Sequence, residues 1–351
     1  MLINFETITL PEGAMRQYID ARQAFTALEQ LRPRQNEFRG GMVWRTSKGH
    51  QYLVRTSPGG AQKGLGRRSP ETEAIYDKFV GGKQRVAEIA SGLRDAIKRH
   101  ERVNRALYVG RTPRIIVELL AAVEASGLSS QFIVIGTNAL YAYETAAGVR
   151  LDQTILATQD LDLLWDNRKT LSLAVQEGPL AEGMLGLLRK VDPTFELRRD
   201  QLYTAVNSKG YEIDILRRLG PGSDEQPRQL KPGADDFWAV QARNSDWLLS
   251  APKFSEVIVS ETGGMARMHT VDPRAFALFK LWMAQDKERE ARKRQRDGMQ
   301  ARAVIELIEE RLPQLRFEDI HMFPAEVRKQ AEAVTQDIAR EMPAGRRTRT
   351  R

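Results

Sequence analysis

The chain of 351 residues contains no cysteine. This absence excludes disulfide bonds, thiolate catalysis and zinc sites built from cysteine. Histidine is scarce as well, and the four that occur are far apart in the sequence: His50, His100, His269 and His321. A histidine-rich metal site is therefore not expected, so carboxylates would have to carry any metal ion.

Long apolar stretches are also missing. No window approaches the roughly 18 to 20 apolar residues that a helix needs to span a bilayer. The N-terminal residues Met1–Thr7 lack the basic start and the long apolar core of a signal peptide. We therefore expect a cytoplasmic protein with no membrane partner.

Acidic residues are outnumbered, with 46 Asp and Glu against 54 Lys and Arg, a net charge of +8. This balance suggests a polyanionic partner such as a nucleotide, RNA or DNA, although an ordinary basic surface is the plainer alternative for a modest excess. The asymmetry is greatest from Arg34 to Arg68, where eight cations accompany a single acid, Glu37. This 34–68 region is either a phosphate-backbone contact or a flexible, glycine-containing surface loop.

Periodicity and breakers predict an α+β protein with an N-terminal helix and hairpin region and a C-terminal helical region. Pro33 is expected to end the first helix, and Gly81-Gly82 to break the second helical region. The expected elements of the two ends are a helix over 14–31, a hairpin formed by 42–45 and 51–55, a glycine-rich segment at 59–69, helices within 70–126, a helix from Pro273 running into a charged stretch at 287–296, helices over 299–311 and 324–341, and a disordered tail at 346–351. The expected domains are 1–128, 129–270 and 271–343, with a basic tail at 344–351.

The centre of the chain carries the most informative pattern. Ile133–Ile135 is predicted to be a short buried strand that stops at Gly136 and turns directly into a helix over 138–147. Free backbone N–H groups at such a junction attract anions, and a glycine lets a phosphate approach the backbone closely. Thr137 can add its hydroxyl to a phosphate, or it can be a helix cap.

A second strand, 160–165, places Asp160 and Asp162 on the same face. Two carboxylates so close repel each other, and the arrangement makes sense if Mg²⁺ lies between them and bridges to substrate phosphates. Asp214 lies on a further alternating strand, 211–217, and would complete a cluster of three acids if the two strands are neighbours. A solvated strand face is the alternative for each acid. A phosphate cradle beside such a pair is the core of a nucleotidyl-transfer site.

These residues resemble the signature of the DNA polymerase β-like nucleotidyltransferase superfamily, in which a glycine with Ser or Thr precedes an acid-x-acid pair and a third acid. A closer likeness is to a bacterial family of nucleotidyltransferase-fold proteins. The blocks that carry this likeness are Gly136–Tyr143, Ala251–Ile258 and Val271–Trp282. Two features depart from the superfamily pattern: threonine replaces the usual serine, and the 24 residues from Gly136 to Asp160 require an insertion.

The resemblance implies a mixed sheet flanked by helices, as in polymerase β-like nucleotidyltransferases. It implies that Asp160, Asp162 and Asp214 bind Mg²⁺ or Mn²⁺ and that Asp214 helps to activate the attacking hydroxyl. The implied nucleotide-binding residues are Gly136, Thr137, Asn138, Lys280, Lys293 and Arg294. For Lys280 the alternative is a lysine on a core helix that extends its ammonium group to solvent, and for the 287–296 stretch it is a solvated helix face.

The leading hypothesis is a metal-dependent nucleotidyltransferase that uses an NTP and an acceptor hydroxyl on RNA, a protein or a small molecule. The 34–68 region favours RNA or another nucleic acid, and a protein could be an acceptor or an inhibitor. Some members of the resembling family are toxins or phage-defence proteins, so the resemblance extends to that role. The alternative hypothesis is a non-catalytic nucleotide- or nucleic-acid-binding module with a degenerate transferase fold.

Overall fold

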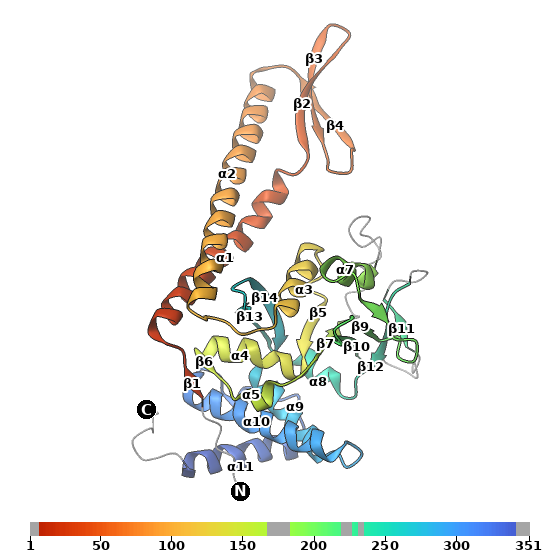
Figure 1. Ribbon diagram of the computed structural model, residues 1–351. Coiled ribbons are helices and arrows are strands. Elements are labelled where there is room, and N and C mark those ends of the chain that lie inside the picture. Colours follow the sequence, from red (N-terminus) through yellow and green to blue (C-terminus); the bar gives the residue numbers. More distant parts are fainter. Residues whose placement is uncertain (1–6, 167–182, 219–226, 231–234, 342–351) are drawn as a thin grey trace. The chain divides into compact units, whose positions relative to one another are not determined.

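The computed structural model describes residues 7–166, 183–218, 227–230 and 235–341 (Figure 1). By their internal contacts the residues form two compact units, Gly13–Val109 and a larger unit made of Met1–Glu12 with Gly110–Arg351. The division expected from the sequence, with boundaries at residues 128, 270 and 343, stays a prediction. None of the helices in the described ranges has both the length and the apolar composition needed to cross a membrane.

The smaller unit is a pair of helices joined by a three-stranded antiparallel sheet in the order β2-β3-β4. Leu31 of the first helix packs with Val86 and Ala90 of the second, and these side chains form a separate small core. The Ser69 side chain accepts a hydrogen bond from the Thr72 N–H and so caps the start of the second helix. The elements are α1 (Glu12–Glu37), β2 (Gly41–Ser47), β3 (His50–Thr56), β4 (Gln62–Arg67) and α2 (Pro70–Ala106).

Two expectations for this unit were wrong, and one alternative is excluded. Pro33 lies inside α1, four residues before its end, where its missing N–H removes one helical hydrogen bond without ending the helix. Gly81-Gly82 does not break α2, because Gly82 serves close packing: a Cβ there would lie 2.4 Å from the Phe38 ring. For the 59–69 segment the sequence left a flexible loop as one of two alternatives, and that alternative does not hold, because most of the segment forms β4 and pairs with β3.

The larger unit is built on a mixed sheet, and the expected α+β class is confirmed. Its main path runs β11-β12-β10-β7-β5-β14-β13, with β9 also on β10 and β8 on β9. The described strands are β5 (Phe132–Ile135), β7 (Asp160–Trp165), β8 (Glu196–Leu197), β9 (Thr204–Val206), β10 (Glu212–Arg217), β11 (Arg228–Gln229), β12 (Trp238–Gln241), β13 (Lys253–Val259) and β14 (Met265–Val271), with β1 (Ile8–Thr9) and β6 (Val149–Arg150) as a separate pair.

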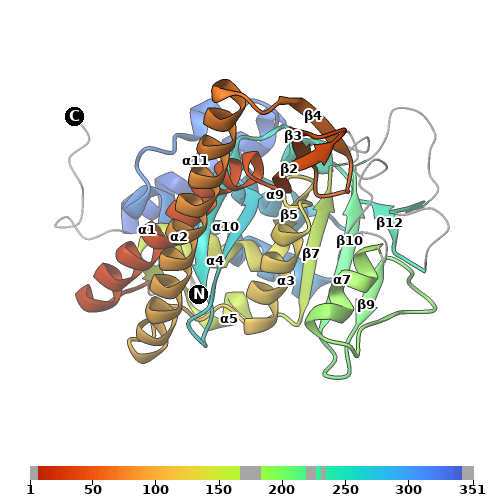
Figure 2. The same cartoon turned by 90° about the horizontal axis from the view of Figure 1, so that it is seen from above.

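Helices cover both faces of this sheet. Figures 1 and 2 show α3 and α7 over one face and α4, α9 and α10 over the other. The strands between them are rich in buried aliphatic residues, such as Leu161, Leu163, Ile213 and Ile215. The helices are α3 (Arg114–Ala125), η1 (Gly136–Ala139), α4 (Leu140–Ala147), α5 (Gln153–Leu156), α7 (Gly183–Val191), α8 (Ser245–Ser250), α9 (Pro273–Gln285), α10 (Ala291–Arg311), η3 (Phe317–Asp319) and α11 (Ala325–Glu341).

The C-terminal helices depart from the expected pattern at one point. The helix that starts at Pro273 does not run into the charged stretch but ends at Gln285, and α10 begins at Ala291. The side chain of Asp286 accepts a hydrogen bond from the Glu288 N–H at 3.0 Å, which is a local turn that competes with helix continuation. The helix expected at 324–341 is present as α11, whereas the tail at 346–351 lies outside the described residues.

Candidate active site

Four carboxylates share one face of two neighbouring strands. Strands β7 and β10 are parallel, with Asp160 opposite Glu212 and Asp162 opposite Asp214. The intervening residues point to the other face and are buried. The condition set by the sequence, that the strand of Asp214 should adjoin the strand of Asp160 and Asp162, is therefore met. We call these four side chains the acidic face.

Gly136 brings the strand-to-helix turn against this face. Its backbone has φ +67°, a conformation that side-chain-bearing residues rarely adopt. A Cβ at this position would lie 2.2 Å from Oδ2 of Asp162, because β5 and β7 pair directly before the turn and Ile135 is opposite Asp162. The glycine is thus required twice, by its backbone angle and by the carboxylate beside it.

Burial and mutual repulsion disfavour the charged forms of two carboxylates on the acidic face. Burial, followed by the nearby charges of Asp160 and Asp214, raises the pKa of Asp162 to about 7, although Lys280 and Arg289 act in the opposite direction. Burial also raises the pKa of Asp214. Each effect disfavours the charged carboxylate. A cation bound at this face would therefore stabilise the charged form.

Glu212, a member of the acidic face, and Thr204, its neighbour, were not among the site residues expected from the sequence. Thr204, on β9, donates its hydroxyl proton to Oδ1 of Asp214 at 2.6 Å and fixes that carboxylate. Glu212 accepts a hydrogen bond from Arg198 at 3.0 Å. The alternation of strand 211–217 already placed Glu212 on the face of Asp214, and this was the available signal. Thr204 reaches the site because β9 pairs with β10, and no comparable sequence pattern indicated that contact.

The turn after Gly136 is held from a distant helix. The Thr137 hydroxyl accepts hydrogen bonds from Gln300 at 3.1 Å and from Arg296 at 3.4 Å, both on α10. Gln300 also donates to the Ile155 carbonyl at 2.7 Å and is fully buried. Thr137 forms no side-chain cap, so the capping alternative is wrong. Gln300 and Arg296 thus position the turn, and neither contact could be predicted from residues close to Thr137 in the chain.

Asn138 is buried rather than open to a ligand. Its amide donates to the carbonyl oxygen of Asp160 at 2.5 Å, and the residue is 1% exposed. The side chain therefore ties the turn to the first residue of β7. Any contact of Asn138 with a nucleotide in this arrangement would have to come from its backbone.

Lys280 is also buried, in an ion pair. Its ammonium group lies 2.7 Å from Asp297, whose other oxygen accepts a hydrogen bond from Arg289 at 2.6 Å. Lys280 is 7% exposed, so its charge does not extend to solvent as the core-helix alternative supposed. Lys293 and Arg294 lie in the first turn of α10, where Lys293 is exposed and Arg294 half-buried.

The chemistry of the acidic face suits a hard divalent cation. Asp160, Asp162 and Asp214 offer only oxygen ligands, and the burial and neighbouring carboxylates that raise the pKa of Asp162 would be offset by a bound cation. Within the described ranges, however, no three His, Cys, Asp or Glu side chains are already grouped closely enough to hold a metal ion. A shared ion would have to draw these carboxylates together.

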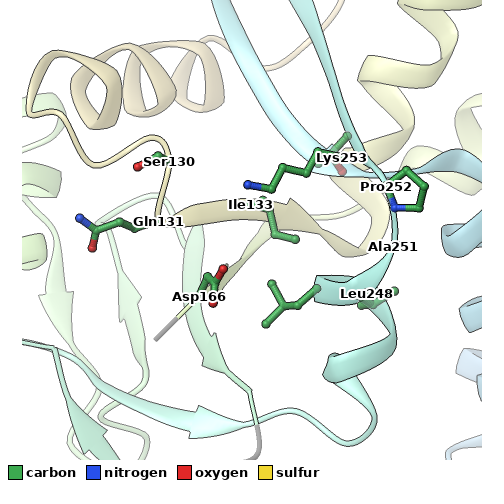
Figure 3. Close-up of a pocket in the computed structure, with 10 residues that line it drawn as sticks. Ser130, Gln131, Ile133, Asp166, Leu248, Ala251, Pro252 and Lys253 are labelled. Atoms are coloured by element: carbon green, nitrogen blue, oxygen red, sulfur yellow. The ribbon is translucent and has the colours of Figure 1, made fainter. Parts of the chain in front are cut away.

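A pocket lies at the opposite end of the central strands. Figure 3 shows Gln131 and Asp166 on one side of it and Lys253 on another. It is found where β5 begins and β7 ends, whereas Gly136 and Asp160 lie where β5 ends and β7 begins. The N–H of Asp166 donates to the Gln131 carbonyl at 2.8 Å, which closes this end of the strand pair. The pocket is thus separate from the acidic face.

Comparison with known proteins identifies a family that this chain matches. The model of a protein family described as nucleotidyltransferase matches residues 114–323, which contain the turn, the acidic face and helices α9 and α10. No curated protein and no solved structure matches the chain. The family match covers more than half of the chain and most of the larger unit.

Proposed function

Because the chain belongs to this nucleotidyltransferase family, we propose that it transfers a nucleoside monophosphate from an NTP to an acceptor hydroxyl and releases pyrophosphate. The observation that carries the proposal is the direct pairing of Asp162 with Asp214 across β7 and β10, beside a turn whose Gly136 packs on the Asp162 carboxylate. A phosphate bound at the turn would therefore lie next to the carboxylates proposed to take part in its transfer.

In this proposal Asp160 and Asp162, together with Asp214, would hold Mg²⁺ or Mn²⁺. The bound metal would neutralise phosphate oxygens and favour an in-line geometry for the transfer. The backbone of Gly136 and Thr137 would contact the triphosphate. The exposed Lys293 and the half-buried Arg294, at the start of α10, would add positive charge. Lys280 acts through its ion pair with Asp297 and is a positioning residue here.

Asp214 is the group proposed to face the acceptor hydroxyl. Thr204 fixes one of its oxygens by a hydrogen bond, which leaves the other oxygen for the acceptor. Its raised pKa brings the carboxylate nearer to the range in which a general base accepts a proton efficiently. The acceptor proton would pass to Asp214 as the new phosphate ester bond forms and the bond to pyrophosphate breaks.

The proposed acceptor is a nucleic acid, with RNA the favoured form. The basic 34–68 region supports this choice, because a chain rich in cations attracts a phosphate backbone. A protein side chain or a small molecule remains the competing acceptor class, and a protein inhibitor would be a further partner. Total RNA and RNA-free lysate, supplied separately, distinguish these acceptors.

The test is label transfer from each α-³²P-labelled NTP in the presence of Mg²⁺, with total RNA and with RNA-free lysate as separate acceptors. We expect Asp160→Ala, Asp162→Ala and Asp214→Ala to abolish transfer. Asp246→Ala is a matched control, because this aspartate is half exposed in an ion pair with Arg218 and lies away from the acidic face. Exposed ion pairs contribute little to stability, so this variant should retain full transfer.

Two results would contradict the proposal. Transfer that survives in Asp162→Ala would exclude the acidic face as its site. Tight NTP binding with no transfer to any acceptor would favour the alternative of a non-catalytic binding module. A Mg²⁺-dependent thermal shift with NTP in the wild type, lost in Asp162→Ala, would support binding at this face independently of the acceptor.

A further inference from the structure

The sheet of the smaller unit has one covered face and one open face. On the covered face Leu53 is fully buried, the rings of Trp44 and Tyr76 are 5.7 Å apart, and the Arg55 guanidinium lies 4.2 Å from the centre of the Phe79 ring. Tyr76 and Phe79 belong to α2, so this face packs on the helix. Since side chains alternate along a strand, the residues between these point outward.

An aromatic ring lies between two arginines on the open face. In the register of the sheet Arg45 of β2 is opposite Tyr52 of β3, and Tyr52 is opposite Arg67 of β4. The three side chains therefore form one row across all three strands. Tyr52 is 36% exposed, and Arg67 donates to His50 at 2.8 Å, which holds its guanidinium on this face. We call Arg45, Tyr52 and Arg67 the open-face row.

The charge around this row has one sign. From residue 38 to residue 70 the sequence contains seven Lys and Arg and no Asp or Glu. Arg68 is neutralised by Glu73 of α2 at 2.6 Å, and Arg55 is held by backbone carbonyls under the sheet. Neither Arg45 nor Arg67 has an ion pair with an acid in the part of the chain that the structure describes. Their charges are available to an anionic ligand.

We propose that the open-face row binds a single strand of nucleic acid, with a base stacked on Tyr52 and phosphates contacting Arg45 and Arg67. An exposed aromatic ring on a small antiparallel sheet offers a platform for a base, and flanking arginines can contact the backbone or stack. In a duplex the faces of the bases are already stacked on one another, so the Tyr52 ring could not stack on them. An acidic polypeptide would match the charge but would not use the ring.

This inference rests on the proposed function in one respect only, because it identifies the surface that would hold a nucleic-acid acceptor. Binding itself requires neither NTP nor metal. The test therefore measures the Kd of the full chain for fluorescent oligonucleotides in EDTA, by anisotropy, at several salt concentrations. The probes are a single-stranded RNA, a single-stranded DNA of the same sequence, the corresponding duplex, and poly-glutamate.

We expect Tyr52→Ser to weaken single-strand binding by roughly tenfold or more, as for the loss of one stacked base. Tyr52→Phe, which keeps the ring, should restore it. Arg45→Gln and Arg67→Gln should each weaken binding and reduce the slope of log K against log salt by about 0.7. Arg94→Gln is the matched control, because Arg94 is an exposed arginine of α2 outside the sheet and its removal lowers the charge equally.

Asp160→Ala should bind as the wild type does, so failure of the transfer chemistry would leave this result intact. Binding to RNA alone among the single strands would add 2′-hydroxyl recognition to the proposal, and binding to both would assign it to bases and phosphates. Equal or tighter binding of the duplex or of poly-glutamate would overturn it. So would an unchanged Kd in Tyr52→Ser, or an equal loss in Arg94→Gln and Arg45→Gln.

Discussion

The side chain of Gln300 donates a hydrogen bond to the hydroxyl of Thr137, and the two residues are 163 positions apart in the chain. The same amide nitrogen also bonds the Ile155 carbonyl. Helix α10 is thereby attached both to the proposed phosphate-binding turn and to the segment that precedes β7. The position of this turn depends on the C-terminal helices as well as on its own sequence.

Gln300→Leu should therefore loosen the turn while leaving its residues unchanged. Leucine is similar in size but leaves a buried carbonyl without its donor, which costs roughly 1–3 kcal/mol of unfolding free energy. We expect KM for the NTP to rise more than kcat falls, because binding of the phosphates is affected first. Urea unfolding and NTP titration measure the two effects.

Gln295→Leu provides the comparison for this variant, since Gln295 is exposed on the same helix. It should change neither quantity. If Gln300→Leu lost stability while KM stayed at the wild-type value, the contact would be structural only and the positioning role would be rejected.

Replacement of Gly136 by alanine should be severe. A left-handed conformation costs an alanine about 1–2 kcal/mol, and here its Cβ would also displace the Asp162 carboxylate. Gly210→Ala separates the two contributions, because Gly210 has φ +76° with open space around it. We expect both variants to lower the midpoint of thermal unfolding and only Gly136→Ala to abolish transfer. Equal activity of the two would refute the importance of the Gly136–Asp162 contact.

Much of the larger unit was predictable because its signals are local. The alternation from Asp160 to Trp165 gave the limits of β7 correctly, and the same rule placed Asp214 on the matching face of its strand. The turn at Gly136 followed from a glycine between a buried strand and a helix. Such patterns report on residues close together in the sequence, where backbone periodicity decides which side chains share a face.

What the sequence could not supply were contacts between distant segments. The isolated signals of Pro33 and Gly81-Gly82 predicted helix breaks that tertiary packing overrode, as in the contact of Gly82 with Phe38. Lys280 appeared as an available cation, because nothing near it in sequence revealed its ion pair with Asp297. The assignment of β4 also required its partner β3, since glycine and charge alone favour a loop.

Two roles can be distinguished for Lys280: a structural ion pair with Asp297 and direct contact with the nucleotide. The ion pair predicts that Lys280→Met lowers the unfolding free energy by up to about 3 kcal/mol, the lower end of the range for breaking a buried pair, because Arg289 still neutralises Asp297. Asp297→Asn should cost more, since it leaves two cations without their acid. Direct contact with the nucleotide would instead raise KM with little change in stability. Lys287→Met, at an exposed position, is the control for loss of one positive charge.

The acidic face should also make stability depend on pH when metal is removed. The pKa of Asp162 rises from 3.8 to about 7 on folding, so between these values the folded protein binds more protons than the unfolded chain. Its contribution to the unfolding free energy is therefore present below pH 4 and lost as pH rises to about 7. At about 1.36 kcal/mol per pKa unit the loss is at most about 4 kcal/mol.

Urea unfolding in EDTA at a series of pH values measures this dependence. Asp162→Asn should flatten the curve and should be more stable than the wild type at pH 8, because the amide carries no charge to bury or repel. Asp246→Asn, at an exposed aspartate, should keep the wild-type slope. Mg²⁺ should restore stability at pH 8 in the wild type and not in Asp162→Asn, since the cation replaces the proton as the neutralising charge. A wild-type slope that Asp162→Asn leaves unchanged would show that Asp162 is not the group that titrates.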